Sequence, residues 1–84
     1  MNRRRLLRRL LAGSLNVSFS DMRNLVEGFG FRLSRIRGSH HVYVHPTIPD
    51  LVNLQERHGA AKPYQVKQFL DIIERYNLQL EDEP

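Results

Sequence analysis

Three of the four histidines in this chain, His40, His41 and His45, fall within six residues of the segment GSHHVYVHP. Histidine is a common metal ligand and the side chain that exchanges a proton near neutral pH. The segment is rich in β-branched and aromatic residues, which favours a strand, and successive side chains of a strand point to opposite faces. A strand would therefore prevent His40 and His41 from holding one ion together.

His41 and His45 share a face of that strand, but their spacing is too wide for a common ligand. Four steps at a rise of about 3.3 Å separate them by about 13 Å, whereas a zinc ligand approaches its ion to about 2 Å. The pattern predicts no metal site. The sequence also places no acidic residue beside His40, so the neighbouring serine does not indicate a Ser-His-Asp triad.

The setting of His40 suits contact with phosphate. Gly38 lets a backbone approach closely, the Ser39 hydroxyl can hydrogen-bond a phosphate oxygen, and Arg35 and Arg37 stand just upstream. On these residues alone two interpretations of His40 stay open, catalysis and the capping of a turn.

A stripe of side chains and the distribution of charge each allow two interpretations, an ordinary surface or a contact with a polyanion. His41, Tyr43 and His45 form a stripe that is either an ordinary solvent-facing strand surface or a nucleic-acid contact. The chain carries a formal charge of +4, and residues 1–37 hold nine arginines against two acidic residues, a local +7, while the remainder is −3. This asymmetry indicates either a polyanionic partner for the first half or a basic face kept for solubility.

Length and composition exclude several classes of protein. A chain of 84 residues forms one small domain, and without cysteine it has no disulfide framework and no thiolate site, which favours a reducing cytoplasm. No apolar run approaches the roughly 20 residues of a membrane span, so no membrane association by a spanning helix is expected. Arg8 and Arg9 interrupt the apolar N-terminal residues, which argues against a secretory signal, and an organellar transit peptide is a minor alternative.

The chain is expected to have the element order α, α, β, β, β, α. Residues 1–17 read as a basic amphipathic extension that packs on the domain, contacts phosphates or lies on a membrane surface, and its four leucines could also anchor a partner. Ser18 is a candidate N-cap for a helix over about residues 21–29. Strands are expected over 31–37, with a bulge near Arg35, over 40–45 and over 51–55, then a loosened segment at 58–61 and a helix opened by Pro63.

These elements predict an α+β fold, a three-stranded antiparallel sheet with helices packed on one face and an N-terminal helical extension. The expected organisation is an extension over residues 1–17, a domain over 18–80 and an acidic tail over 81–84.

Over residues 18–80 the sequence resembles HicA-type toxins, the small ribonuclease partners of bacterial toxin-antitoxin modules. The resemblance rests on the string Gly30-Phe31, Arg35, Gly38-Ser39-His40-His41, Tyr43 and His45-Pro46. The sequence departs from that family's pattern in the third strand, where Leu51 to His58 replace a V-P-x-H pattern, and at the opening of the last helix, Lys62 to Val66.

The resemblance implies a double-stranded-RNA-binding-like fold, translation-independent cleavage of mRNA and inhibition by a cognate HicB-type antitoxin. It makes His40 the key histidine and His41 a less essential neighbour. The sequence therefore predicts a metal-independent ribonuclease with His40 as general acid and base and without a small-molecule cofactor; the expected RNA contacts are Gly38, Ser39, His41, Arg35, Arg37 and Lys62. The alternative is a non-catalytic module of the same fold that binds RNA or an antitoxin.

Overall fold

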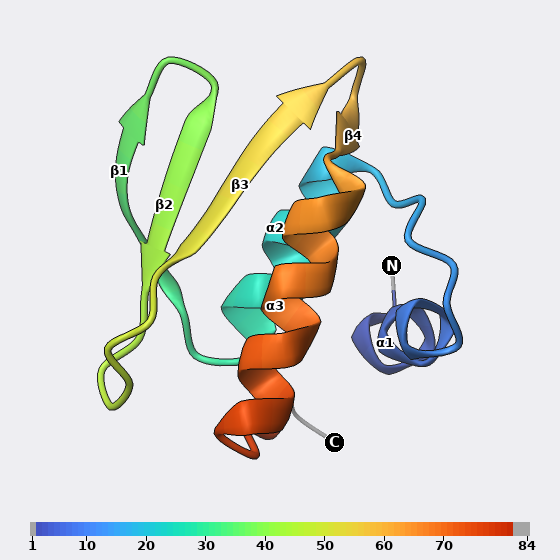
Figure 1. The fold of residues 1–84 in the computed structure, drawn as a ribbon, viewed down its shortest axis with the longest axis vertical. Helices are drawn as coiled ribbons and strands as arrows, with labels where there is room; N and C mark the ends of the chain where they lie inside the picture. The colour runs from blue at the N-terminus through green and yellow to red at the C-terminus, as the bar shows by residue number, and fades with distance from the viewer. Residues whose placement is uncertain (1, 82–84) are drawn as a thin grey trace.

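The structure, a computed structural model, describes residues 2–81 and contains a four-stranded antiparallel sheet and three helices. Figure 1 shows helices α2 and α3 beside the sheet and α1 at the opposite side of the molecule from β1. The elements are α1 (Arg3–Leu11), α2 (Phe19–Gly28), β1 (Arg32–Arg37), β2 (His40–Val44), β3 (Val52–Arg57), β4 (Ala60–Ala61) and α3 (Pro63–Arg75).

The sheet follows chain order, β1-β2-β3-β4, and it has one strand more than the three expected. Ala60–Ala61 was expected to be part of a loosened segment, which is wrong. His58 and Gly59 adopt φ values of +52° and +81° and turn the chain back on β3. A strand of two alanines is too short to show an alternating pattern, so its sequence carries no strand signal.

The β1–β2 hairpin confirms the expected turn at Gly38-Ser39 and the expected bulge. Pairing shifts between Leu33 and Arg35, so Ser34 is the extra residue of β1. Gly38 has φ +62°, a left-handed conformation that glycine adopts without steric cost. The turn therefore places His40 at the first position of β2, directly opposite Arg37.

The helix boundaries follow from local capping. The Ser18 hydroxyl accepts a hydrogen bond from the Asp21 backbone N–H at 3.1 Å and so caps α2 as expected. Pro63 is the first residue of α3, where its missing N–H has no cost. The sequence thus predicted the start of α3, whereas α2 begins at Phe19, about two residues before the expected start at residue 21, because Ser18 itself is the N-cap.

Helix α1 packs on the domain, one of the three roles open from sequence. Leu6 and Leu10 are buried in the same core as α2 and α3, and Leu10 is only 1% exposed. The expectation that all four leucines could anchor a partner is therefore wrong, since the domain itself covers two of them. Leu11, at 61% exposed, faces solvent.

One face of the sheet forms the core with the helices. Tyr43, Val52 and Leu54 on this face are 0–2% exposed. The stripe of His41, Tyr43 and His45 therefore faces the helices, and both interpretations of it as an exposed surface are wrong for Tyr43. The ring of His41 packs against Phe19 and that of His45 against Phe31, each with ring centroids 4.9 Å apart.

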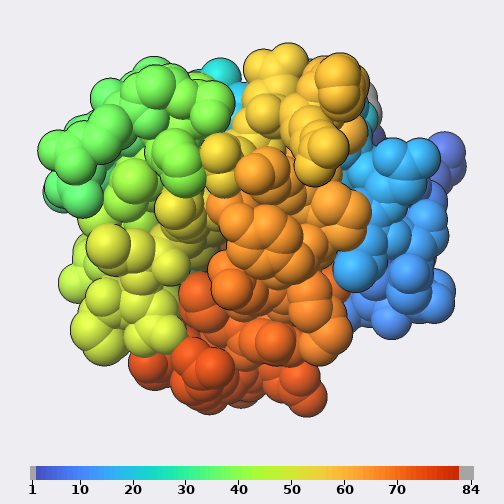
Figure 2. Space-filling view, turned by 45° about the horizontal axis from the view of Figure 1, so that its top comes forward, coloured from blue at the N-terminus to red at the C-terminus, as the bar shows by residue number. Residues whose placement is uncertain are grey.

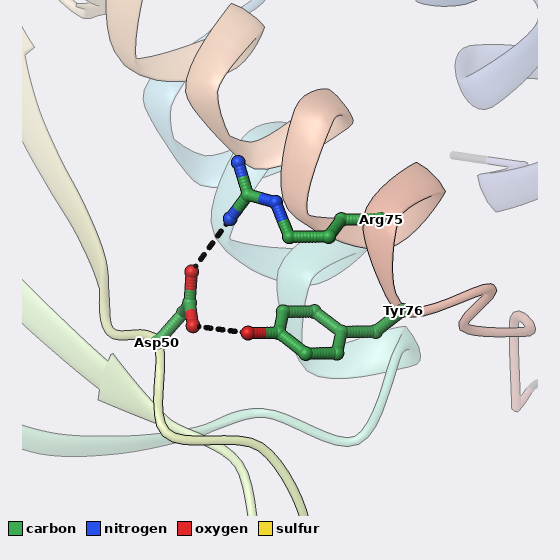
Figure 3. A network of polar contacts seen from close by, with 3 residues as sticks. All are labelled: Asp50, Arg75 and Tyr76. Atoms are coloured by element: carbon green, nitrogen blue, oxygen red, sulfur yellow. Dashed lines mark hydrogen bonds and ion pairs between the residues drawn. The ribbon is translucent and has the colours of Figure 1, made fainter.

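The side chains of two tyrosines, Tyr43 and Tyr76, form hydrogen bonds that connect different parts of the fold. Arg23 Nε of α2 donates to the hydroxyl of Tyr43 at 2.8 Å, and burial raises the pKa of Tyr43 above its ordinary value of 10.0. Asp50 accepts hydrogen bonds from Arg75 at 2.8 Å and from the Tyr76 hydroxyl at 2.7 Å (Figure 3), and the bond to Asp50 raises the pKa of Tyr76. These contacts hold the loop before β3 against the end of α3.

Two further expectations from the sequence concern the acidic tail and membrane-spanning helices. The acidic tail expected over residues 81–84 lies, apart from Glu81, outside the described residues. Within residues 2–81 the three helices are all too short and too polar to cross a membrane.

Candidate nucleic-acid interface

His40 lies on the face of the hairpin that turns away from the helices. Residues paired across antiparallel strands share a face, and His40 pairs with Arg37 of β1 and with Gln55 of β3. Arg35, two residues before Arg37, lies on the same face. Both arginines are exposed and His40 is half-buried. The sheet therefore brings one histidine and two guanidinium groups together on an open surface.

Asn53 of β3 holds the imidazole of His40 from the side. The Nδ1 atom of His40 lies 3.4 Å from the Oδ1 atom of Asn53. Because an amide oxygen only accepts hydrogen bonds, this contact favours the tautomer with its proton on Nδ1. The Nε2 atom then keeps its lone pair, which is the arrangement that a general base requires.

A chain of side-chain hydrogen bonds runs from the hairpin turn to α3. Gln55 Nε2 donates to the Ser39 hydroxyl at 3.4 Å, and Gln65 Nε2 donates to Gln55 Oε1 at 3.5 Å and to the Tyr64 hydroxyl at 3.3 Å. Gln65, only 3% exposed, also accepts from the Gln55 backbone N–H at 2.6 Å. Figure 2 shows the hairpin, the β3–β4 turn and the first turns of α3 on one continuous face.

The turn itself is open to a ligand. Among the described residues, no heavy atom beyond the chain neighbours of Gly38 lies within 4 Å of where its Cβ would stand. A phosphate can therefore approach the backbone of the turn beside His40 and Ser39 without displacing a side chain.

The structure separates the other two expected RNA contacts from this surface. His41 is half-buried, its ring lies on the helix-facing side, and its Nδ1 atom lies 3.4 Å from the backbone oxygen of Ser39. Lys62 is the N-cap residue of α3 and lines a separate hollow with Arg57. His40, Arg35, Arg37, Gly38 and Ser39 are thus the expected residues that the fold gathers together.

Sequence reasoning missed Asn53, Gln55 and Gln65. A usable signal was present for the first two, because they alternate with the apolar Val52 and Leu54 and so belong to the face opposite the core. Gln65 stands four residues before Phe69, a buried position of α3, where a polar side chain indicates a specific partner.

Within residues 2–81, no cluster of three or more histidine, aspartate or glutamate side chains is arranged to hold a metal ion.

Comparison with known proteins assigns the family. Residues 19–74 match the protein family described as HicA toxin of bacterial toxin-antitoxin, and this match covers well over half of the chain. The chain belongs to the HicA toxin family. Searches of curated proteins and of solved structures returned no significant match.

Membership in the HicA family agrees with the resemblance seen in the sequence. The candidate site lies within the matched range. The matched range begins at the first residue of α2 and ends one residue before α3 does, so it contains the whole sheet and the surface around His40. Helix α1 precedes the match, although its Leu6 and Leu10 belong to the same core.

Proposed function

We propose that this HicA-family chain is the toxin of a toxin-antitoxin module and that it cleaves RNA, with mRNA as its substrate, in the cytoplasm. The observation that carries the proposal is the placement of His40 on an open face opposite Arg37, with Asn53 at its Nδ1 atom. A single base beside two cations is suited to RNA because the 2′-hydroxyl supplies the nucleophile.

In the proposed reaction, the 2′-oxygen attacks the adjacent phosphorus and the bond to the 5′-oxygen of the next nucleotide breaks. His40 Nε2 takes the proton of the 2′-hydroxyl and returns a proton to the departing 5′-oxygen. Arg37 and Arg35 stabilise the additional negative charge on the phosphorus oxygens. The products are a 2′,3′-cyclic phosphate and a 5′-hydroxyl, and no metal or small-molecule cofactor is required.

We further propose that the domain binds RNA in the manner of a double-stranded-RNA-binding fold. The order of helix α2, sheet and helix α3 supports this. The minor groove of A-form RNA is wide and shallow, so the protein would contact sugars and phosphates more than bases and show weak sequence preference. Gly38 and Ser39 would contact the phosphate, while an RNA contact by His41 stays a prediction for the exposed part of its ring.

The test is an RNA cleavage assay with and without a strong chelator. We expect equal rates in both conditions and products that end in a 2′,3′-cyclic phosphate. Protein carrying His40→Gln, purified in the same way, controls for contaminating nucleases. Cleavage that stops on chelation, or products with a 3′-hydroxyl, would contradict this mechanism. Binding without cleavage would favour the non-catalytic alternative.

A further inference from the structure

A hollow of about 530 Å³ lies between the β3–β4 turn, the segment before α2 and the start of α3. Its size is within the range of about 300–1,000 Å³ that is usual for small-molecule sites. Apolar side chains of Leu15, Ala60 and Pro63 contribute to its wall. The hollow is separate from His40, and the proposed cleavage step makes no use of it.

The aromatic side chain at this hollow is unusually exposed. Tyr64 is 57% exposed, although its neighbour Gln65 is buried. The bond from Gln65 Nε2 to the Tyr64 hydroxyl restrains the ring at the first turn of α3. A restrained and exposed aromatic ring is a platform on which a nucleic-acid base can stack, and stacking accepts any base.

The charges around the hollow match a polyanion. Arg57 and Lys62 line it from two sides, and His58 stands on the turn between them along the chain. Among the described residues, no acidic side chain lines it. An acidic protein would also meet complementary charge here, but the apolar wall and the exposed ring of Tyr64 are better matched to one flat base beside its phosphates.

The hollow is also connected to the surface around His40. Asn53, Gln55 and Arg57 alternate along β3 and therefore share the face opposite the core. Asn53 contacts His40 and Gln55 contacts Ser39. Arg57 lines the hollow. A strand of RNA leaving His40 along β3 would reach Tyr64 without crossing the molecule.

We propose that this hollow is a second RNA site, in which Tyr64 stacks on an unpaired base outside the cleaved linkage and Arg57 and Lys62 bind the flanking phosphates. The inference rests on the proposed RNA substrate. It adds a binding site for an unpaired segment that continues from the RNA bound at His40, and it favours substrates long enough to span both sites.

The test compares mixed-sequence single-stranded RNA long enough to span from His40 to Tyr64 with mixed-sequence trinucleotides. Binding is measured by fluorescence anisotropy in the His40→Gln background, and cleavage is measured with His40 intact. Tyr64→Ala should weaken binding of the long RNA by about 5- to 150-fold, the usual cost of one lost base stack. Cleavage of trinucleotides should be unchanged, and Tyr64→Phe, which keeps the ring but loses the bond from Gln65, should weaken binding of the long RNA less than Tyr64→Ala does.

A second variant gives an independent measurement. Arg57→Gln should reduce the slope of log affinity against log salt by about 0.7 for the long RNA, because one phosphate contact on a single strand is lost. Lys67→Gln is the matched control and should leave the slope unchanged, because it removes an exposed cation of α3 that does not line the hollow. It should leave the fold and the Tyr64 effect in place.

Three results would overturn the proposal. The first is equal binding of long RNA by the unmodified protein and Tyr64→Ala. The second is an equal loss for long RNA and trinucleotides, which would indicate a general structural effect. The third is a weakened complex with an antitoxin and unchanged RNA binding, which would make the hollow a protein contact. Stacking at Tyr64 without any cleavage would instead uphold the second site and contradict the proposed ribonuclease activity alone.

Discussion

At the scale of single residues, the proposed chemistry depends on which side chains share a face with His40. Arg37 is its cross-strand partner and Arg35 lies two residues away on the same strand face. Asn53, which sequence reasoning missed, orients the ring through Nδ1. His40, the Asn53 amide beside it and the two arginines therefore come from three neighbouring strands.

The arginine pair carries a prediction about salt. If both guanidinium groups contact phosphates, the double variant Arg35→Gln, Arg37→Gln should bind RNA more weakly. Its slope of log affinity against log salt should be shallower by about 1.4–1.8, at about 0.7–0.9 per lost contact. Filter binding across a salt series measures this slope. Lys67→Gln, which removes a cation paired with Asp71 on α3, is the matched control. An unchanged slope in the double variant would show that the pair does not bind phosphate.

At the scale of elements, burial of the Tyr43 phenol where β2 meets α2 makes the stability of the fold depend on pH. Burial raises the pKa of its phenol in the folded state above 10.0, so the folded state holds this proton more tightly than the unfolded state. The resulting stability is fully present below pH 10.0 and is lost as the pH rises through the folded-state pKa.

We therefore predict that the free energy of unfolding of the unmodified protein falls above pH 10.0. The free energy of unfolding of the Tyr43→Phe variant should fall less steeply over the same pH range. At neutral pH the same variant should be less stable by about 0.5–1.5 kcal/mol, since it loses the hydrogen bond from Arg23. Urea denaturation followed by circular dichroism at several pH values measures both effects, with Tyr64→Phe as the control. The same alkaline slope in Tyr43→Phe and the unmodified protein would refute the role of this phenol.

The elements also show what the sequence could predict. Ser18, Gly38-Ser39 and Pro63 marked their boundaries correctly because capping and turn preferences are local properties of the chain. Alternation correctly separated His40 from His41, but it could not tell which face of the sheet the helices cover. That choice depends on long-range packing, and for this reason Tyr43 was assigned to an exposed stripe although it is fully buried.

At the scale of the whole molecule, membership in the HicA toxin family implies an antitoxin partner, and the exposed arginines beside His40 offer it a charged surface. The first half of the chain is strongly basic, with nine arginines against two acidic residues over residues 1–37. We propose that the cognate HicB-type antitoxin expected for this family presents acidic groups to Arg35 and Arg37 and covers His40. Helix α1 would contribute little through Leu6 and Leu10, because the domain already buries both.

Co-expression with the antitoxin should restore growth, and association should slow as salt is added, because complementary charge mainly accelerates association. The Arg35→Gln, Arg37→Gln variant should associate more slowly at low salt and show a smaller salt effect. Stopped-flow mixing measures these rates. A complex that leaves His40 open to modification by diethyl pyrocarbonate would contradict inhibition by occlusion.

The most direct test of the central claim is the rate at which His40→Gln cleaves RNA in single-turnover conditions. General acid–base catalysis contributes about 10²–10⁴ to the rate, so we predict a loss of at least about a hundredfold with RNA binding retained. His45→Gln is the matched control, since His45 lies at the other end of the same strand segment and packs on Phe31. It should cleave at nearly the unmodified rate. A His40→Gln protein that cleaves RNA within a few-fold of the unmodified protein would contradict the account.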